Sequence, residues 1–257
     1  LFCSSIFYFV FKKKIKFKQL FLISSIGYAT HGLLDGCTSY GTQLLWPFSN
    51  SRIAWNNISI IDPLFTIPLL ILVVTSVLKQ NTMIAKISFI YVLLYFSFGV
   101  FQRERAEEII INLAHSRQHR PKRIVVKPSL ANLILWKSVY EYNGRFYLDA
   151  VRLIGKKQVI TGTKIKKLNI IPAERGSILY QDIKRFQWFS DDYLANHPTE
   201  KNTIIDIRYS FIPNKITPLW GIKFDTDMPG AHVQFSTYHK VTPEILKEFL
   251  SMVFSYN

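Results

Sequence analysis

ISFIYVLLYFSFGVFQ, residues 87–102, is a run of about sixteen residues without Lys, Arg or Glu. Two further runs share this property, Gln19–Leu34 and Pro63–Leu78. A helix needs roughly 20 apolar residues to cross a hydrocarbon core of about 30 Å, and flanking lysines can extend to the headgroups from a slightly shorter run. We therefore predict membrane helices over residues 19–36, 59–78 and 87–102. The alternative for these runs is a set of buried helices in a soluble protein.

Charge divides the 257-residue chain into two unequal parts. The whole chain is 49% hydrophobic with a net charge of +15, which excludes a disordered polymer. Residues 1–101 hold two acidic side chains, Asp35 and Asp62, against eight Lys or Arg, whereas residues 102–257 hold 24 basic and 15 acidic residues. This contrast predicts a transmembrane domain over 1–102, a connecting helix and linker over 103–127, and an extramembrane domain over 128–257.

The topology is predicted from a lysine cluster. Lys12, Lys13, Lys14, Lys16 and Lys18 follow a short apolar run, residues 1–11, which we interpret as the end of a helix that begins upstream, in a chain that is a fragment. A signal peptide would carry its positive charges before the apolar run. The positive-inside rule places the cluster in the cytoplasm, and counting helices from there places the C-terminal domain on the outer face. The predicted location is a membrane that the chain crosses several times.

The C-terminal part has alternating, β-rich segments. Strands are predicted over residues 133–140, 145–154, 203–211, 219–224 and 231–237. Helices are predicted over 181–195 and over 243–254, where Thr242-Pro243-Glu244 is a start signal. Successive strands are more common here than alternating strands and helices. The predicted fold is therefore an α-helical polytopic membrane domain followed by a small α+β extramembrane domain.

The ionisable side chains of the membrane part form a candidate site. His31 and Asp35 are four residues apart, so a helix projects both from one face. Asp62 begins the next apolar helix and is expected at a similar depth. Ionisable groups are costly in a membrane unless they pair, bind a metal or line a cavity. The structural alternatives are a solvated carboxylate for Asp35, an N-cap for Asp62 and an interhelical hydrogen bond for His31.

His and Asp ligands suit a catalytic divalent ion, zinc first, with manganese or iron as alternatives. In that interpretation His31, Asp35 and Asp62 are metal ligands, and Asp35 or Asp62 takes a proton from metal-bound water. The set is incomplete, because residues 1–101 contain no further histidine or carboxylate. Nucleotide-binding and familiar hydrolase motifs are absent, and the dispersed basic residues give no support to nucleic-acid binding.

The loop between the apolar runs Gln19–Leu34 and Pro63–Leu78 carries one arginine and several aromatic residues. Arg52 has two interpretations, an anion-stabilising group or an arginine that extends to lipid headgroups. Trp46-Pro47-Phe48 is either part of a site wall or an interfacial aromatic anchor. The expected partners are the lipid bilayer and its anionic headgroups.

Three segments of the membrane part have a characteristic sequence: ATHGLLD (29–35), TSYGTQLLWPFS (38–49) and IDP (61–63). They resemble the YdjM-like family of bacterial inner-membrane, metal-dependent hydrolases, and the resemblance implies a bacterial inner membrane as the location. Residues 127–130, 135–140, 144–152 and 185–190 more weakly resemble the extra C-terminal domain of longer members. It implies that His31 and Asp35 are metal ligands or their partners and that Asp62 is a further site residue. Upstream histidine segments of the family are absent from this sequence.

The sequence therefore predicts a membrane-bound metal-dependent hydrolase that acts on an ester or phosphoester of a lipid or membrane-adjacent substrate. The alternative is a non-catalytic membrane anchor or scaffold that presents the C-terminal domain. A transporter is disfavoured, because the polar cluster is predicted near an interface and not at the bilayer midplane.

Overall fold

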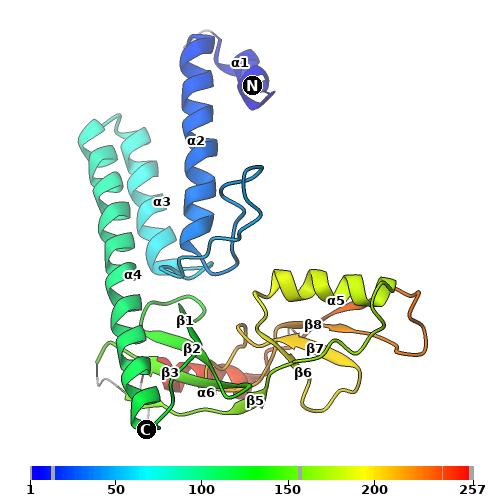
Figure 1. Ribbon diagram of the computed structural model, residues 1–257. Helices are drawn as coiled ribbons and strands as arrows, with labels where there is room; N and C mark the ends of the chain where they lie inside the picture. The colour runs from blue at the N-terminus through cyan, green and yellow to red at the C-terminus, as the bar shows by residue number, and fades with distance from the viewer. Residues whose placement is uncertain (1, 13–14, 156–157, 239, 255–257) are drawn as a thin grey trace.

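A computed structural model describes residues 2–12, 15–155, 158–238 and 240–254. A column of helices stands on two β-sheets (Figure 1). The column is formed by α1 (Phe2–Phe11), α2 (Phe17–Cys37), α3 (Pro63–Leu78) and α4 (Thr82–Ser116). α1 packs against α2, and α3 packs against α4.

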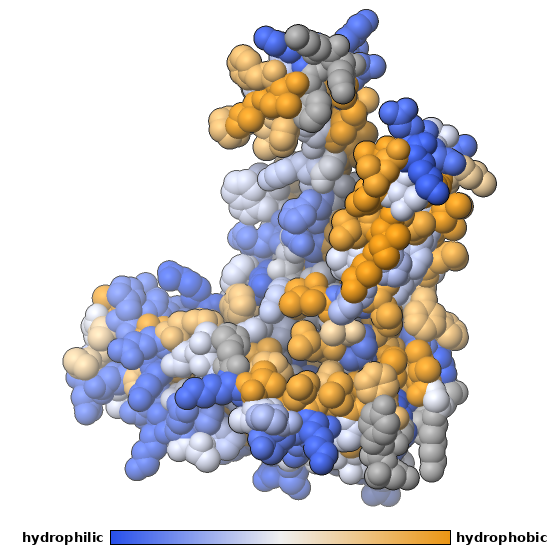
Figure 2. All heavy atoms as spheres, turned by 180° about the vertical axis from the view of Figure 1, so that it is seen from behind, coloured by the Kyte–Doolittle hydropathy of each residue, from blue (hydrophilic) through white to orange (hydrophobic). Residues whose placement is uncertain are grey.

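The first half of helix α4 consists mainly of apolar residues, and its second half carries most of its charged residues. Asn81 caps it, accepting hydrogen bonds from the backbone N–H groups of Met83 and Ile84 at 2.8 and 3.4 Å. Its most apolar window is only 11% buried within the molecule, so it is not the core helix of a soluble protein. Figure 2 shows apolar side chains gathered along the helical column.

The predicted polytopic membrane domain is wrong. Among the described residues, α4 is the one helix long and apolar enough to cross a membrane. Helix α3 has 16 residues, short of the roughly 20 that a span requires, and α2 has 21 residues diluted by Ser, Thr, His and Asp side chains. Two residues of the lysine cluster, Lys13 and Lys14, lie outside the described residues.

The small α+β description of the C-terminal domain is also wrong, because this region is mostly β-sheet. An antiparallel sheet has the order β1-β2-β3-β4, with β5 also paired to β3, and a second has the order β6-β7-β8-β9. The strands are β1 (Arg123–Pro128), β2 (Leu135–Tyr142), β3 (Arg145–Arg152), β4 (Gln158–Ile160), β5 (Lys164–Lys166), β6 (Leu194–Asn196), β7 (Thr203–Asp206), β8 (Trp220–Lys223) and β9 (Gln234–Thr237). The helices of this region are α5 (Ile178–Phe189) and α6 (Pro243–Phe254).

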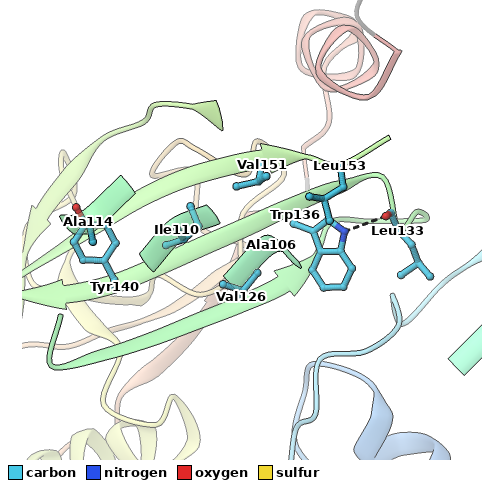
Figure 3. Close-up of a cluster of buried hydrophobic side chains, with 9 residues drawn as sticks. All are labelled: Ala106, Ile110, Ala114, Val126, Leu133, Trp136, Tyr140, Val151 and Leu153. Carbon is cyan, nitrogen blue, oxygen red and sulfur yellow. Dashed lines mark hydrogen bonds between the residues drawn. The ribbon is translucent and has the colours of Figure 1, made fainter. Parts of the chain in front are cut away.

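The charged end of α4 covers one face of the first sheet. Ala106, Ile110 and Ala114 recur every fourth residue, so they form one helix face, and all three are fully buried. They pack with Trp136 and Tyr140 of β2 (Figure 3). The indole N–H of Trp136 donates to the backbone oxygen of Leu133 at 3.0 Å, which satisfies the buried polar atom.

The opposite face of the first sheet contacts the second sheet and α6. Val139, Phe146 and Leu148 pack against Ala195 and Ile205 of the second sheet. α6 adds a smaller cluster at one end of the first sheet and begins at the predicted position. α5 supplies a further core against β7 and β8. The two sheets therefore enclose an apolar layer between them.

Two local predictions differ from the structure. Residues 121–128 are predicted as a linker, but 123–128 form β1, because pairing with β2 satisfies their backbone groups and Pro128 stands at the strand end. The helix predicted over 181–195 ends at Phe189, and Ser190, Asp191 and Asp192 turn the chain into β6, with positive φ at both aspartates. Tertiary pairing decides both outcomes.

Candidate functional site

The loop of residues 38–62 connects the helical column to the sheets. It folds back beside α2, held by an antiparallel bridge between Thr42 and Ile53 (Figure 1). The Tyr209 hydroxyl donates to the backbone oxygen of Ser39, and the backbone N–H of Ala131 donates to Ser59 Oγ at 3.0 Å. These contacts fix the loop against the C-terminal region.

A cavity of about 320 Å³ lies between this loop and the C-terminal region. Three cationic side chains line it, Arg52, Lys127 and Arg208, against one carboxylate, Asp191. The aromatic rings of Trp188, Phe189, Tyr40 and Tyr193 complete most of the wall. We call this space the basic cavity. Its excess of positive charge favours an anionic ligand.

Arg52 reaches from the loop to the C-terminal end of α5. Its guanidinium donates to the backbone oxygens of Phe189, Tyr40 and Gly41, and its Cζ lies 4.3 Å from the ring centroid of Phe189. No carboxylate of the described residues forms an ion pair with Arg52. Burial, and next Arg208, lowers the pKa of Arg52, although an arginine remains charged at neutral pH. Three of its five N–H donors are used, so two remain for a ligand.

Two lysines face each other in the apolar layer between the sheets. Lys127 of β1 and Lys137 of β2 are direct cross-strand partners, and their exposed fractions are 5% and 3%. Like charges at such positions destabilise a sheet. Lys127 Nζ lies 3.0 Å from the ring centroid of Tyr209, and no carboxylate in the described part of the chain pairs with it. Burial, and next Arg208, lowers the pKa of Lys127 well below its usual value.

Arg208 is the paired cation of this group. Its Nε and its terminal nitrogen donate to the two carboxylate oxygens of Asp206 at 3.0 and 2.7 Å, and a further bond reaches the backbone oxygen of Phe189 at 3.0 Å. Burial acts to lower the pKa of Arg208, but Asp206 outweighs it, so the net shift is upward. Asp206 is fully buried, and both of its carboxylate oxygens accept hydrogen bonds from Arg208.

A second, smaller cavity of about 120 Å³ adjoins the basic cavity and shares Lys127 and Arg208 with it. Lys137 and Ser210 line it, together with apolar residues that include Leu130 and Leu219. We call this space the inner cavity. In the inner cavity, the buried amine of Lys137 and the hydroxyl of Ser210 lie near Lys127 and Arg208.

The predicted pairing of His31 and Asp35 on one helix face is confirmed. His31 Nε2 lies 3.4 Å from Asp35 Oδ2 on α2, and the two side chains are 72% and 49% exposed. His31 also borders an open hollow of about 680 Å³ between α1 and α2. The pair is therefore available to solvent or lipid and lies outside the two cavities described above.

Asp62 takes the structural role that the sequence offered as an alternative. It is the N-cap of α3, and its Oδ1 accepts from the backbone N–H groups of Leu64 and Phe65 at 3.1 and 3.4 Å. Its Oδ2 accepts from the Tyr95 hydroxyl at 2.7 Å, and the side chain is 2% exposed. Both carboxylate oxygens are therefore engaged.

The described residues do not complete the predicted metal centre. They contain no group of three or more His, Cys, Asp or Glu side chains placed to hold one ion. His31 and Asp35 would supply two ligands, whereas a catalytic zinc takes three from the protein. These residues alone therefore do not fit a catalytic metal site.

The cationic residues of the two cavities were missed by sequence reasoning, apart from Arg52. Lys127 and Lys137 are each two residues from an apolar residue that shares their sheet face, Val125 and Val139 respectively, and this spacing is the signal in the sequence. Ionisable residues on the apolar face of a strand are uncommon unless paired. Their contact with Arg208 depends on pairing between distant segments.

The motifs behind the family resemblance occupy one continuous structural unit: the exposed pair on α2, the loop of residues 38–62, and the capped start of α3. Residues 1–106 match the YdjM inner membrane protein family. The resemblance is thus confirmed for this part of the chain, up to the first residues of α4 that contact the sheet. The match and the apolar α4 together indicate an inner membrane protein. No curated protein and no solved structure matches the chain.

Proposed function

We propose that this protein binds the phosphate-bearing headgroup of an anionic lipid in the basic cavity. The observation that carries the proposal is the convergence of Arg52, Lys127 and Arg208 on one cavity with a single lining carboxylate, Asp191. A phosphodiester supplies the missing negative charge and accepts hydrogen bonds from the unused guanidinium donors. A volume of about 320 Å³ is within the range of small-ligand sites.

The location of the cavity favours a lipid over a free anion. The loop that supplies Arg52 also presents Trp46 and Phe48 outward, and Phe48 is 95% exposed. Exposed aromatic residues at this position are typical of anchors at the headgroup level of a bilayer. The same loop follows α2 and precedes α3, next to the apolar part of α4. Because Arg52 of this loop lines the basic cavity, an anchored loop would bring the cavity near the lipid headgroups.

Ligand binding in this proposal is linked to protonation. In the free protein, burial and nearby cations lower the pKa of Lys127. A bound phosphate favours the charged ammonium form, so binding raises that pKa and takes up a proton. The affinity for the lipid therefore falls as the pH rises past the pKa of Lys127 in the free protein.

The test is a binding titration of the full chain in detergent. Dihexanoylphosphatidylglycerol is compared with dihexanoylphosphatidylcholine, glycerol 3-phosphate and inorganic phosphate. We expect phosphatidylglycerol to bind most tightly and Arg52→Gln to weaken it roughly 10- to 100-fold, because a charge-assisted hydrogen bond is lost. The matched control is Arg145→Gln, an exposed arginine at the start of β3. Equal affinity for phosphatidylcholine, or an unchanged affinity in Arg52→Gln, would refute the proposal.

Metal-dependent hydrolysis of a lipid ester or phosphoester is the second candidate, and the His31–Asp35 pair favours it. The described residues supply only these two ligands at one place, so we derive no reaction step through a metal. The measurement is the metal content of the purified protein, with zinc, manganese and iron quantified together. Stoichiometric metal that disappears in Asp35→Ala supports this candidate, and metal content unchanged by that substitution counts against it.

A further inference from the structure

The inner cavity contains a serine and a lysine in hydrogen-bond contact. Lys137 Nζ lies 2.9 Å from Ser210 Oγ, although the residues are 73 positions apart in the chain. The second hydrogen bond of Lys137 goes to the backbone oxygen of Pro213 at 2.9 Å. Ser210 is partly exposed to the cavity, whereas Lys137 is buried behind it. The hydroxyl is therefore the outer member of the pair and the amine the inner one.

The surroundings of Lys137 favour its neutral form. Burial lowers the pKa of this amine to about 7. The charged groups that face it are Lys127 across the β1–β2 pair, Arg208 in the wall of the same cavity, and Asp206. Asp206 acts in the opposite direction, but it is already bound by Arg208 at both oxygens. A large fraction of Lys137 is therefore an uncharged amine at neutral pH.

A neutral lysine can accept a proton from a serine hydroxyl. The Ser210 hydroxyl donates to the backbone oxygen of Ile212 at 2.8 Å and accepts from Lys137 Nζ. When Lys137 is neutral, the lone pair on Nζ is a second acceptor for the hydroxyl hydrogen. A hydroxyl rotates freely between such partners. When its hydrogen points to Lys137, the oxygen lone pairs are free to attack an electrophile in the cavity.

We propose that Ser210 and Lys137 are the nucleophile and general base of a serine hydrolase that acts on carboxylic esters. Ser210 Oγ forms a bond to the acyl carbon while its proton passes to Lys137 Nζ. The bond from the acyl carbon to the alcohol oxygen then breaks, and Lys137 returns the proton to the leaving alcohol. Water next attacks the acyl-serine, giving up a proton through Lys137, and releases the carboxylic acid and free Ser210.

The two cavities define a substrate class. The apolar side chains of Leu130, Leu219 and Ile60 line the inner cavity and suit an acyl group. Arg208 lies in the wall that both cavities share, where its positive charge can stabilise an oxyanion. The basic cavity suits a phosphate group and the inner cavity suits the carbonyl end of an acyl chain, so we expect the substrate to be an acyl ester of a phospholipid. That choice of ester rests on the proposed headgroup function, whereas the assignment of Ser210 and Lys137 does not.

The test is labelling of the full chain in detergent with a fluorophosphonate, which reacts with activated serines and needs no lipid. We expect one adduct, located at Ser210 by peptide mass spectrometry of the wild-type protein. Ser210→Ala should abolish labelling, and Lys137→Met should slow it by roughly 10²–10⁴-fold, the usual contribution of a general base. Ser236→Ala, in β9, is the matched control and should label at the wild-type rate.

The pH profile separates a catalytic from a structural lysine. The labelling rate should rise with pH and reach half its maximum near pH 7, where Lys137 loses its proton. An absence of adduct at Ser210 in wild-type protein, or equal labelling of Lys137→Met, would overturn the assignment. Because the peptide mapping uses unaltered protein, a variant that fails to fold does not affect it. Labelling of Ser210 without phosphatidylglycerol binding would overturn the headgroup proposal alone.

Discussion

Replacement of Lys127 by methionine should make the protein more stable and at the same time remove its response to an anionic lipid. Lys127 is buried opposite Lys137, and its Nζ contacts the Tyr209 ring without a carboxylate partner among the described residues. Methionine has a similar length and no polar group to bury. Removal of a buried amine that has no carboxylate partner is worth about 1–3 kcal/mol. For a chain of this size, that gain raises Tm by roughly 2–12 °C.

The assay is thermal unfolding in detergent, followed by tryptophan fluorescence, with and without dihexanoylphosphatidylglycerol. Wild-type protein should start at the lower Tm and gain stability from the lipid, because a ligand that binds only the folded state raises its stability. Lys127→Met should start higher and gain less. Lys223→Met, at the exposed end of β8, is the control and should change neither quantity appreciably. A lower Tm for Lys127→Met without lipid, or a full lipid response, would refute the reasoning.

The other predictions concern the pH response, the core and the N-cap. Because the pKa of Lys137 is about 7 in the folded state and about 10.4 when unfolded, the unfolded chain holds more protons between these values, so stability should rise with pH across that window. Lys137→Met should flatten this rise in Tm measured from pH 6.5 to 9.5. Ile110→Ala should cost about 2–5 kcal/mol in chemical denaturation, since the side chain is fully buried between α4 and the sheet, and a loss below 1 kcal/mol would contradict the packing described here. Asp62→Ala should cost about 1–2 kcal/mol through the lost cap, whereas Asp62→Asn should recover part of it, and equal losses would contradict a capping role.

Local patterns predicted much of the secondary structure. The apolar runs, the Thr242-Pro243-Glu244 start of α6 and the strand pair at β2 and β3 all follow from residue types within a few positions. The number of membrane spans was predicted wrongly, because α2 and α3 are apolar but fall short in hydropathy or in length. An apolar run indicates a helix more reliably than it indicates what surrounds that helix.

The candidate site was less accessible to prediction. The closeness of His31 and Asp35 follows from helical spacing alone and is confirmed, and the N-cap interpretation of Asp62 follows from the proline after it. The basic cavity depends instead on the register that places Lys127 opposite Lys137, and on the packing that adds Arg208 and Arg52. No sequence separation or periodicity connects these four residues. Their proximity follows only from the packing of the loop against the sheets.

Helix α4 belongs both to the apolar helical column and to the core of the first sheet. Thirty-five residues of continuous helix rise about 52 Å, and the same rod is apolar at its start and supplies Ala106, Ile110 and Ala114 to the sheet core at its end. Cleaving the chain after Ala114 would therefore remove part of the sheet core, so an intact C-terminal fragment has to begin before Ala106. The same continuous helix joins the apolar segment to the sheets without a break between Thr82 and Ser116.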